Sequence, residues 1–301
     1  MGSRLAVYSL MAVALLSMSI GLAADEDYAA RFKELREQKA DAQIEPLLNE
    51  WREKRPNDPD AWITSANYYF NQRQVVISTK KPQKGDFSLT DKKTEKQAGS
   101  ISFESDEAAT KRAADLLQQA TTKFPDRLDI WCGLAFVYQE SGDFDSEFST
   151  LQKMVSYARD HMAQLRWLKG ENLPEPADHF IPEKLHSYGM YYEKKENPED
   201  DKRFLKIATF AAEQFPDHPY AFNDVALYYS IAGDNAKTRE WLEKAHKTDP
   251  KDMLVLMNLG QICSKLGDNR AALKWYQEVL KVDPDGEYAR QATDALAKLK
   301  K

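Results

Sequence analysis

The chain has 301 residues, and its 48 acidic residues outnumber its 42 basic residues, so the net charge is −6. An acidic chain whose lysines are scattered among carboxylates has no basic stripe to release counterions from phosphates, which argues against a nucleic-acid partner. The two cysteines, Cys132 and Cys263, are far apart in the chain, so we expect buried thiols and a fold stabilised by packing rather than by a disulfide.

The first 24 residues have the features of a signal peptide. Arg4 precedes an uncharged run over Leu5–Ala24, which ends in small residues. Gly21 and Ala23 fit the −3 and −1 positions of a signal-peptidase site, so we expect cleavage after residue 23 or 24. No lipoprotein cysteine follows, and the expected mature protein is periplasmic or secreted, without a stable membrane anchor. The alternative is an uncleaved N-terminal anchor, because about twenty apolar residues can span a bilayer.

A regular spacing of prolines and glycines follows along the chain. Pro182, Pro216, Pro250 and Pro284 are 34 residues apart, and Gly142, Gly233 and Gly267, each followed by Asp, lie midway between one proline position and the next. A 34-residue period with a turn at its midpoint predicts two helices of about a dozen residues in each unit.

The residues between these turns resemble the tetratricopeptide-repeat (TPR) family. Its pattern of large, small and aromatic positions is matched at Leu256, Leu259, Gly260, Ala272 and Tyr276. The same offsets recur in two earlier units, at Phe222, Val225, Ala226, Tyr229 and Ala245 and at Trp131, Leu134, Ala135 and Tyr138. The resemblance covers at least 125–284. It implies an all-α, right-handed superhelical solenoid in which a small residue lets helix A of each pair approach helix B.

The period predicts the domain organisation. We expect a signal peptide over 1–24, a degenerate pair over 25–55, a repeat over 56–124 with an insertion at about 74–105, a repeat over 125–158, an interruption over 159–181, repeats over 182–215, 216–249 and 250–283, and a capping helix over 284–301. The unit after Pro182 fits worst, because Tyr188, Tyr191 and Phe204 are only approximately in phase. A half-polar final helix is expected because the last repeat would otherwise expose its core face.

The insertion has a different pattern from the helices around it. Val75–Ile77, Phe87–Leu89 and Ile101–Phe103 are short apolar or alternating runs between turn residues, which predicts two or three short strands. The insertion leaves the solenoid between the two helices of one repeat. It is either a binding element at the edge of the solenoid or a loop without function. The aromatic residues near Trp167 and Phe180 are expected in the core rather than in a ligand pocket.

No catalytic, metal-binding or phosphate-binding motif occurs in the sequence. His179, Glu183 and His186 form the one possible grouping, but Pro182 lies among them, so we expect no metal and no cofactor. A hydrolase would need a globular domain, and no stretch outside the repeats is long enough to form one. We therefore expect no enzyme, although an envelope hydrolase with an unrecognised site remains an alternative.

The resemblance implies that helix A of each repeat lines a concave groove that binds a peptide or a partner helix. The family's groove offsets fall on Asn67, Phe70, Phe136, Gln139, Tyr220, Asn223, Leu227, Met257 and Gln261. By the same offsets Tyr69, Ala226 and Tyr229 face the neighbouring helix and should be buried. Ile63 and Cys132 occupy the position where the chaperone-tail branch of the family has lysine, which disfavours binding of a terminal carboxylate.

The expected function is that of an adaptor or assembly factor in the bacterial cell envelope, with another protein or peptide as partner. The alternative from another class is a homo-oligomeric structural protein.

Overall fold

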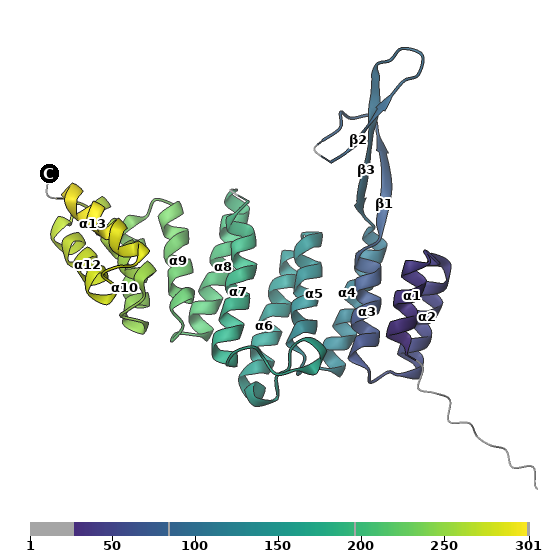
Figure 1. Ribbon diagram of the computed structural model, residues 1–301, viewed down its shortest axis with the longest axis horizontal. Coiled ribbons are helices and arrows are strands. Elements are labelled where there is room, and N and C mark those ends of the chain that lie inside the picture. Colours follow the sequence, from purple (N-terminus) through teal and green to yellow (C-terminus); the bar gives the residue numbers. More distant parts are fainter. Residues whose placement is uncertain (1–26, 84, 196, 300–301) are drawn as a thin grey trace, which may run out of the picture. The chain divides into compact units, whose positions relative to one another are not determined.

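The structure is a computed structural model that describes residues 27–299, apart from residues 84 and 196 (Figure 1). The chain divides into two compact units at the bond between Arg55 and Pro56. The expected signal peptide lies outside the described residues. Among the residues that are described, no helix is long and apolar enough to cross a membrane.

The first unit contains the helices α1 (Tyr28–Glu37) and α2 (Asp41–Lys54). The Asp27 side chain caps α1 by accepting a hydrogen bond from the backbone N–H of Ala30. Ile44 and Leu48 of α2 are fully buried, and the ring of Tyr28 stacks on that of Trp51 with centroids 5.7 Å apart. The two helices thus form an antiparallel pair closed by an aromatic contact.

The second unit is a stack of helix pairs followed by one further helix (Figure 1). Its helices are α3 (Pro59–Phe70), α4 (Glu107–Lys123), α5 (Leu128–Ser141), α6 (Phe144–His161), α7 (Ala177–Glu193), α8 (Pro198–Gln214), α9 (Pro219–Ile231), α10 (Asn235–Thr248), α11 (Met253–Lys265), α12 (Asn269–Val282) and α13 (Glu287–Leu299). Each odd-numbered helix up to α11 packs against the helix that follows it. The prediction of an all-α solenoid built from helix pairs is confirmed.

The glycine–aspartate pairs form the turns inside three of these helix pairs. Gly142, Gly233 and Gly267 have φ values of 77°, 77° and 76°, a left-handed conformation that ends a helix at little cost only for glycine. The aspartate that follows each glycine then caps the next helix, as the Asp234 carboxylate does by accepting from the N–H of Lys237 at 3.0 Å. The turn in the middle of each of these repeats is therefore determined by the glycine and the aspartate that form it.

A small residue sets the distance between the two helices of a pair. A Cβ atom on Gly260 in α11 would lie 2.4 Å from the Tyr276 ring in α12, so only glycine fits there. Gly189 in α7 has the corresponding position, because its Cβ would lie 3.1 Å from the Phe204 ring in α8. Gly189 therefore fixes which residues of α7 face its partner helix.

The position of Gly189 shows that the repeat boundary predicted at Pro182 is wrong. Pro182 does not mark a turn between repeats but lies in the second turn of α7, which begins at Ala177. Pro182 is the sixth residue of α7, so the helix lacks the hydrogen bond that an N–H at this position would donate to the carbonyl of Asp178. The interruption after α6 consists of two short 3₁₀ turns, Met162–Gln164 and Leu168–Gly170, and is shorter than the expected 159–181.

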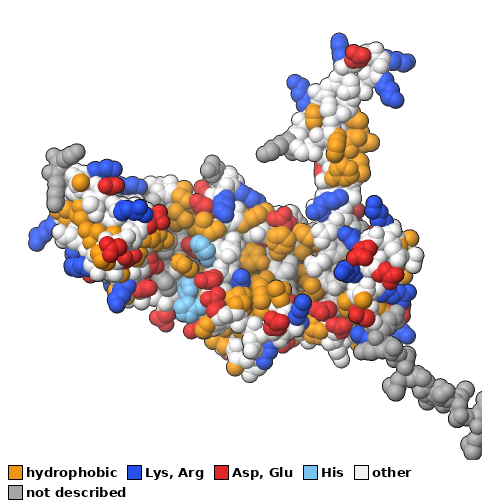
Figure 2. All heavy atoms as spheres, in the orientation of Figure 1, with side chains coloured by type: hydrophobic (Ala, Val, Ile, Leu, Met, Phe, Trp, Pro, Cys, Tyr) orange, Lys and Arg blue, Asp and Glu red, His pale blue; other side chains and the backbone are white. Residues whose placement is uncertain are grey.

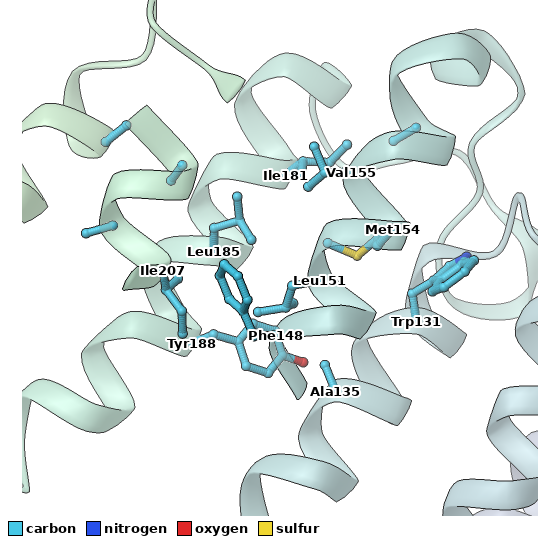
Figure 3. Packing of buried hydrophobic residues seen from close by; sticks show 14 of the residues in the cluster. Trp131, Ala135, Phe148, Leu151, Met154, Val155, Ile181, Leu185, Tyr188 and Ile207 are labelled. Atoms are coloured by element: carbon cyan, nitrogen blue, oxygen red, sulfur yellow. The ribbon is translucent and has the colours of Figure 1, made fainter. Parts of the chain in front are cut away.

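Two apolar clusters are described in the part of the second unit that follows α4. The larger one extends from Leu128 in α5 to Val225 in α9, and Figure 3 shows Phe148 of α6 packed beside Leu185 and Tyr188 of α7. The second begins at Ala226, the next residue of α9, and extends to Ala292 in α13. The aromatic residues around Phe180 belong to the first cluster, as the sequence predicted.

The insertion forms a three-stranded antiparallel sheet between α3 and α4. Its strands are β1 (Arg73–Ser78), β2 (Phe87–Thr90) and β3 (Gln97–Ser105), in the order β1-β3-β2. They extend beyond the ends of the two helices (Figure 1). A Cβ on Gly99 would lie 2.1 Å from the carbonyl oxygen of Ser78, so the chain approaches itself closely there. The predicted short strands are confirmed.

Candidate functional site

A shallow pocket of about 100 Å³ lies between α9 and α11. Its most exposed lining residues, Gln261 and Lys265, are polar, and three of its four buried ones are apolar. The lining residues are Asn223, Ala226, Leu227, Ser230, Thr238, Leu242, Asn258, Gln261, Ile262 and Lys265. Three of the nine residues predicted for a groove, Asn223, Leu227 and Gln261, are therefore brought together in one place. Leu227 and Gln261 occupy the same position of successive repeats, and Asn223 lies one helical turn before Leu227, so the three share a face.

The hydrogen bond between two amide side chains of this pocket is weak. The Nδ2 of Asn258 donates to the Oδ1 of Asn223 at 3.4 Å, which is at the long end for a hydrogen bond. Asn223 and Leu227 are half-buried, and Gln261 is exposed. An amide can donate and accept at the same time, so these side chains can exchange their present contacts for bonds to a peptide backbone.

A histidine–aspartate pair lies one repeat away, at the junction of α7 and α9. The Nδ1 of His186 is 2.8 Å from the Oδ2 of Asp224, a buried carboxylate, and the ring donates its N–H to this group. The hydrogen bond that His186 donates to Asp224 raises the pKa of His186, and burial raises the pKa of Asp224. The exposed ring of Tyr220 stacks on His186 with centroids 5.5 Å apart.

His186 occupies a groove position that the sequence reasoning missed. It precedes the small residue Gly189 by three positions, just as Asn223 precedes Ala226 and Met257 precedes Gly260. The error came from taking Pro182 as a turn. The sequence contains a signal that could have corrected this error. The spacing between Gly189 and Phe204 is the same, to within one residue, as the spacing between Gly260 and Tyr276.

At the other end of the stack, three predicted residues share the surface of α3 and α5. Asn67 and Phe136 are exposed, and Phe70 is half-buried. The rings of Phe70 and Phe136 meet edge to face with centroids 5.6 Å apart. These helices therefore present an apolar platform with one amide beside it.

Two of the predicted groove residues are instead in the core. Gln139 is 6% exposed because its Nε2 donates to the Oε1 of the buried Glu147 at 2.8 Å. Met257 is 3% exposed and packs in the second apolar cluster. Of the residues expected to be buried, Tyr69 and Ala226 are, but Tyr229 is only half-buried.

The residues considered for metal binding do not come together. Within residues 27–299, excluding the two that are not described, no group of three histidine, cysteine or carboxylate side chains is arranged to hold a metal ion. His179 lies beside His218 instead, with ring centroids 5.4 Å apart. Cys132 in α5 and Cys263 in α11 are free thiols; Cys263 is buried as predicted, whereas Cys132 is half-buried.

Known proteins share parts of this sequence and fold. The family model of the tetratricopeptide repeat matches residues 254–285. The TPR repeat-containing protein PA4667 of Pseudomonas aeruginosa is 29% identical over 168 residues, and this match spans 51% of the chain and 28% of the relative.

Two solved structures are among those that resemble parts of this chain. The first TPR of Spaghetti (RPAP3), bound to the HSP90 peptide SRMEEVD, covers 40% of this chain and 90% of its own at 19% identity and a TM-score of 0.35. YrrB, a TPR protein with an unusual peptide-binding site, covers 82% of this chain and 97% of its own at 13% identity and a TM-score of 0.40. The match over 254–285 shows a tetratricopeptide repeat in this part of the chain, and the other helix pairs with glycine–aspartate turns resemble it.

Proposed function

We propose that this protein is a protein–protein interaction scaffold that binds an extended peptide segment of its partner across α9 and α11. The observation that carries the proposal is the pocket lined by Asn223, Leu227, Asn258 and Gln261. Three amide side chains can hydrogen-bond a peptide backbone, while Leu227 offers an apolar contact for a side chain of the peptide.

The surface next to this pocket supports a longer binding line. Tyr220 and His186 continue from α9 to α7, and both keep part of their rings exposed. His186 can present its second ring nitrogen to a ligand because its Nδ1 is held by Asp224. An extended segment lying along the A helices would thus meet amides on α9 and α11 and an aromatic–imidazole pair beside them.

The cellular role that we propose is that of an adaptor or assembly factor in the bacterial cell envelope. Export is supported by the charge at Arg4, the uncharged run after it and the small residues that end the run. A binding role rather than a catalytic one is supported by the family, whose members are generally non-enzymatic interaction modules with extended concave surfaces.

Site-specific photo-crosslinking in a bacterial host tests the groove and does not require the partner to be identified first. A photoreactive amino acid at Leu227 should give a discrete crosslinked product, whereas the same group at the exposed Glu240 on α10 should not. Adding Gln261→Lys should lower the yield at Leu227 at least about fivefold, the effect of losing roughly 1 kcal/mol at an interface. Its melting temperature should stay within a few degrees, because substitutions at exposed positions cost little stability. Equal crosslinking at both positions would contradict binding in the groove.

A further inference from the structure

A pocket of about 620 Å³ opens where the sheet of the insertion joins the helices. Its lining comes from the last residues of α3 and β3, one face of α4, the end of α5 and the start of α6. Figure 2 shows charged side chains on the helices at the base of the projecting sheet. The pocket lies at the other end of the stack from the one between α9 and α11, so it is a separate site and does not depend on the function proposed above.

The lining of this pocket is strongly acidic. Among the described residues that form it, Lys111 is the only basic one, and five are carboxylates: Glu104, Glu107, Asp115, Glu140 and Asp143. All five are exposed, and within the described part of the chain no ion pair engages Glu107, Asp115 or Glu140. Like charges held close together repel one another, and a surface of one sign attracts ligands of the opposite sign. The pocket therefore favours a cationic ligand.

The face of α4 that borders the pocket carries a buried hydroxyl group without a partner. α4 contributes lining residues at helical spacing from Glu107 to Asp115, and Thr110 is among them. Thr110 is 8% exposed, and no group among the described residues forms a hydrogen bond with its Oγ1. A buried hydroxyl that forms no hydrogen bond costs stability, and the bond can be formed with a ligand instead. Threonine in a helix uses two χ1 rotamers, so the hydroxyl can turn toward a ligand in the pocket.

The remaining lining residues suit the other parts of a peptide. Phe70, Val137 and Tyr138 provide apolar and aromatic area. Burial raises the pKa of the Tyr138 hydroxyl, and the charges of Asp143 and Asp115 raise it further, so these carboxylates act on the ring. A guanidinium group can pair with a carboxylate and stack on such a ring at the same time. Further hydroxyl groups, which can both donate and accept, are provided by Ser105, Ser141 and Ser146.

We propose that this pocket binds a basic segment of a partner protein, whose lysine or arginine side chains pair with the carboxylates while an apolar side chain lies against Phe70 and Val137. Such a segment brings several cations at once, which suits carboxylates that come from β3, α4, α5 and the turn before α6. A single metal ion fits less well, because no group of three ligand side chains among the described residues is arranged to hold one. A polyamine supplies cations but no acceptor for the hydroxyl groups, whereas a peptide backbone has its carbonyls.

Fluorescence anisotropy with the full chain and a short labelled peptide, in which arginine and leucine alternate, tests the binding. At low salt the peptide should bind with a Kd below about 100 μM. The affinity should fall as salt is added, because exposed charges are screened. The same peptide with glutamate in place of arginine should not bind. A basic peptide that shows no saturable binding up to about 1 mM would overturn the proposal.

Two charge-neutralising variants locate the site. Asp115→Asn with Glu140→Gln removes two exposed carboxylates of the pocket and should weaken binding of the basic peptide at least about fivefold. Glu213→Gln with Asp294→Asn makes the same change of charge at exposed positions on α8 and α13 and should leave the Kd within about twofold. Equal weakening by the two variants would mean that the peptide responds to the overall charge of the protein, and the pocket would not be its site.

Thr110→Val and a competing polyamine test the peptide in the pocket. The valine keeps the shape of the side chain and removes its hydroxyl, so the peptide should bind about threefold more weakly or worse. The midpoint of urea unfolding should stay the same or rise, because a buried hydroxyl without a partner is gone. Spermine should displace the peptide only at concentrations at least about tenfold above the Kd of the peptide. Unchanged affinity in Thr110→Val would place the peptide outside the pocket, and displacement by spermine at the Kd itself would assign the pocket to a polyamine; either result would overturn the proposal.

Discussion

The buried carboxyl of Glu147 should make the stability of the solenoid depend on pH. Glu147 lies in the first turn of α6, is 0% exposed and accepts hydrogen bonds from Gln139 and from the Tyr192 hydroxyl. Burial raises the pKa of this carboxyl from 4.5 to about 7, and the two hydrogen bonds oppose the shift only in part. The folded chain therefore holds a proton that the unfolded chain has already released at neutral pH.

The sign and the size of the effect follow from these two pKa values. Below about pH 4.5 both states are protonated, and the group does not affect stability. Between pH 4.5 and 7 only the unfolded state loses its proton, so the free energy of unfolding falls as the pH rises. At about 1.36 kcal/mol for each pKa unit, the total loss is roughly 3 kcal/mol, of which about 2.5 kcal/mol falls between pH 5 and 8.

Glu147→Gln removes the titrating group and keeps its shape. Its amide can still accept from Gln139 and donate to the Tyr192 oxygen. Urea unfolding followed by tryptophan fluorescence should show the variant gaining about 2.5 kcal/mol relative to the original chain between pH 5 and 8. Asp145→Asn, at an exposed carboxylate two residues earlier in α6, should show no such gain. If Glu147→Gln and the original chain lost stability in parallel over this range, the argument from burial would be wrong.

Three further predictions concern the helix pairs, the signal peptide and the insertion. Gly260→Ala should lower the free energy of unfolding by about 1–3 kcal/mol, because the new methyl group meets the Tyr276 ring. Gly189→Ala should lower it by less, because the Phe204 ring is farther away. Equal losses in urea unfolding would contradict this reasoning. Mass spectrometry of the protein exported by a bacterial host should give an N-terminus at Ala24 or Asp25, and a full-length membrane product would contradict cleavage. Deletion of 76–103, joined by a short turn, should leave the helical circular-dichroism signal, and loss of that signal would make the sheet part of the core.

The repeating elements could be predicted because their causes are local. Glycine in a left-handed turn, aspartate at a helix start and a small residue facing an aromatic each act within one helix pair and recur with the period. α7 was misplaced because Pro182 matches the spacing of the turn prolines by chance. A single proline fits a turn and can also stand in the second turn of a helix at the loss of one hydrogen bond, and the packing of Gly189 on Phe204 distinguishes the two.

The groove was harder to predict because exposure depends on neighbouring helices. Gln139 has the same offset in α5 as the half-exposed Phe70 in α3, yet it is buried by Glu147 of α6 and lies 3.4 Å from the carbonyl oxygen of Tyr188 in α7. The pattern of one repeat contains no information about these partners. Asn223, Leu227 and Gln261 line one pocket, whereas Met257, which the same pattern predicted in α11, is buried.

The boundary between the two apolar clusters falls inside α9. Val225 packs with the helices before it and Ala226 with those after it, so one helix belongs to both cores. Helices α10 to α13 can therefore unfold locally while α5 to α8 stay folded, and their backbone amides then exchange with solvent. This requires that α9 keep its contacts with α7 and α8. The pocket lined by Asn223, Leu227 and Gln261 lies at this boundary. A ligand held there would link the two cores and slow exchange on the C-terminal side first.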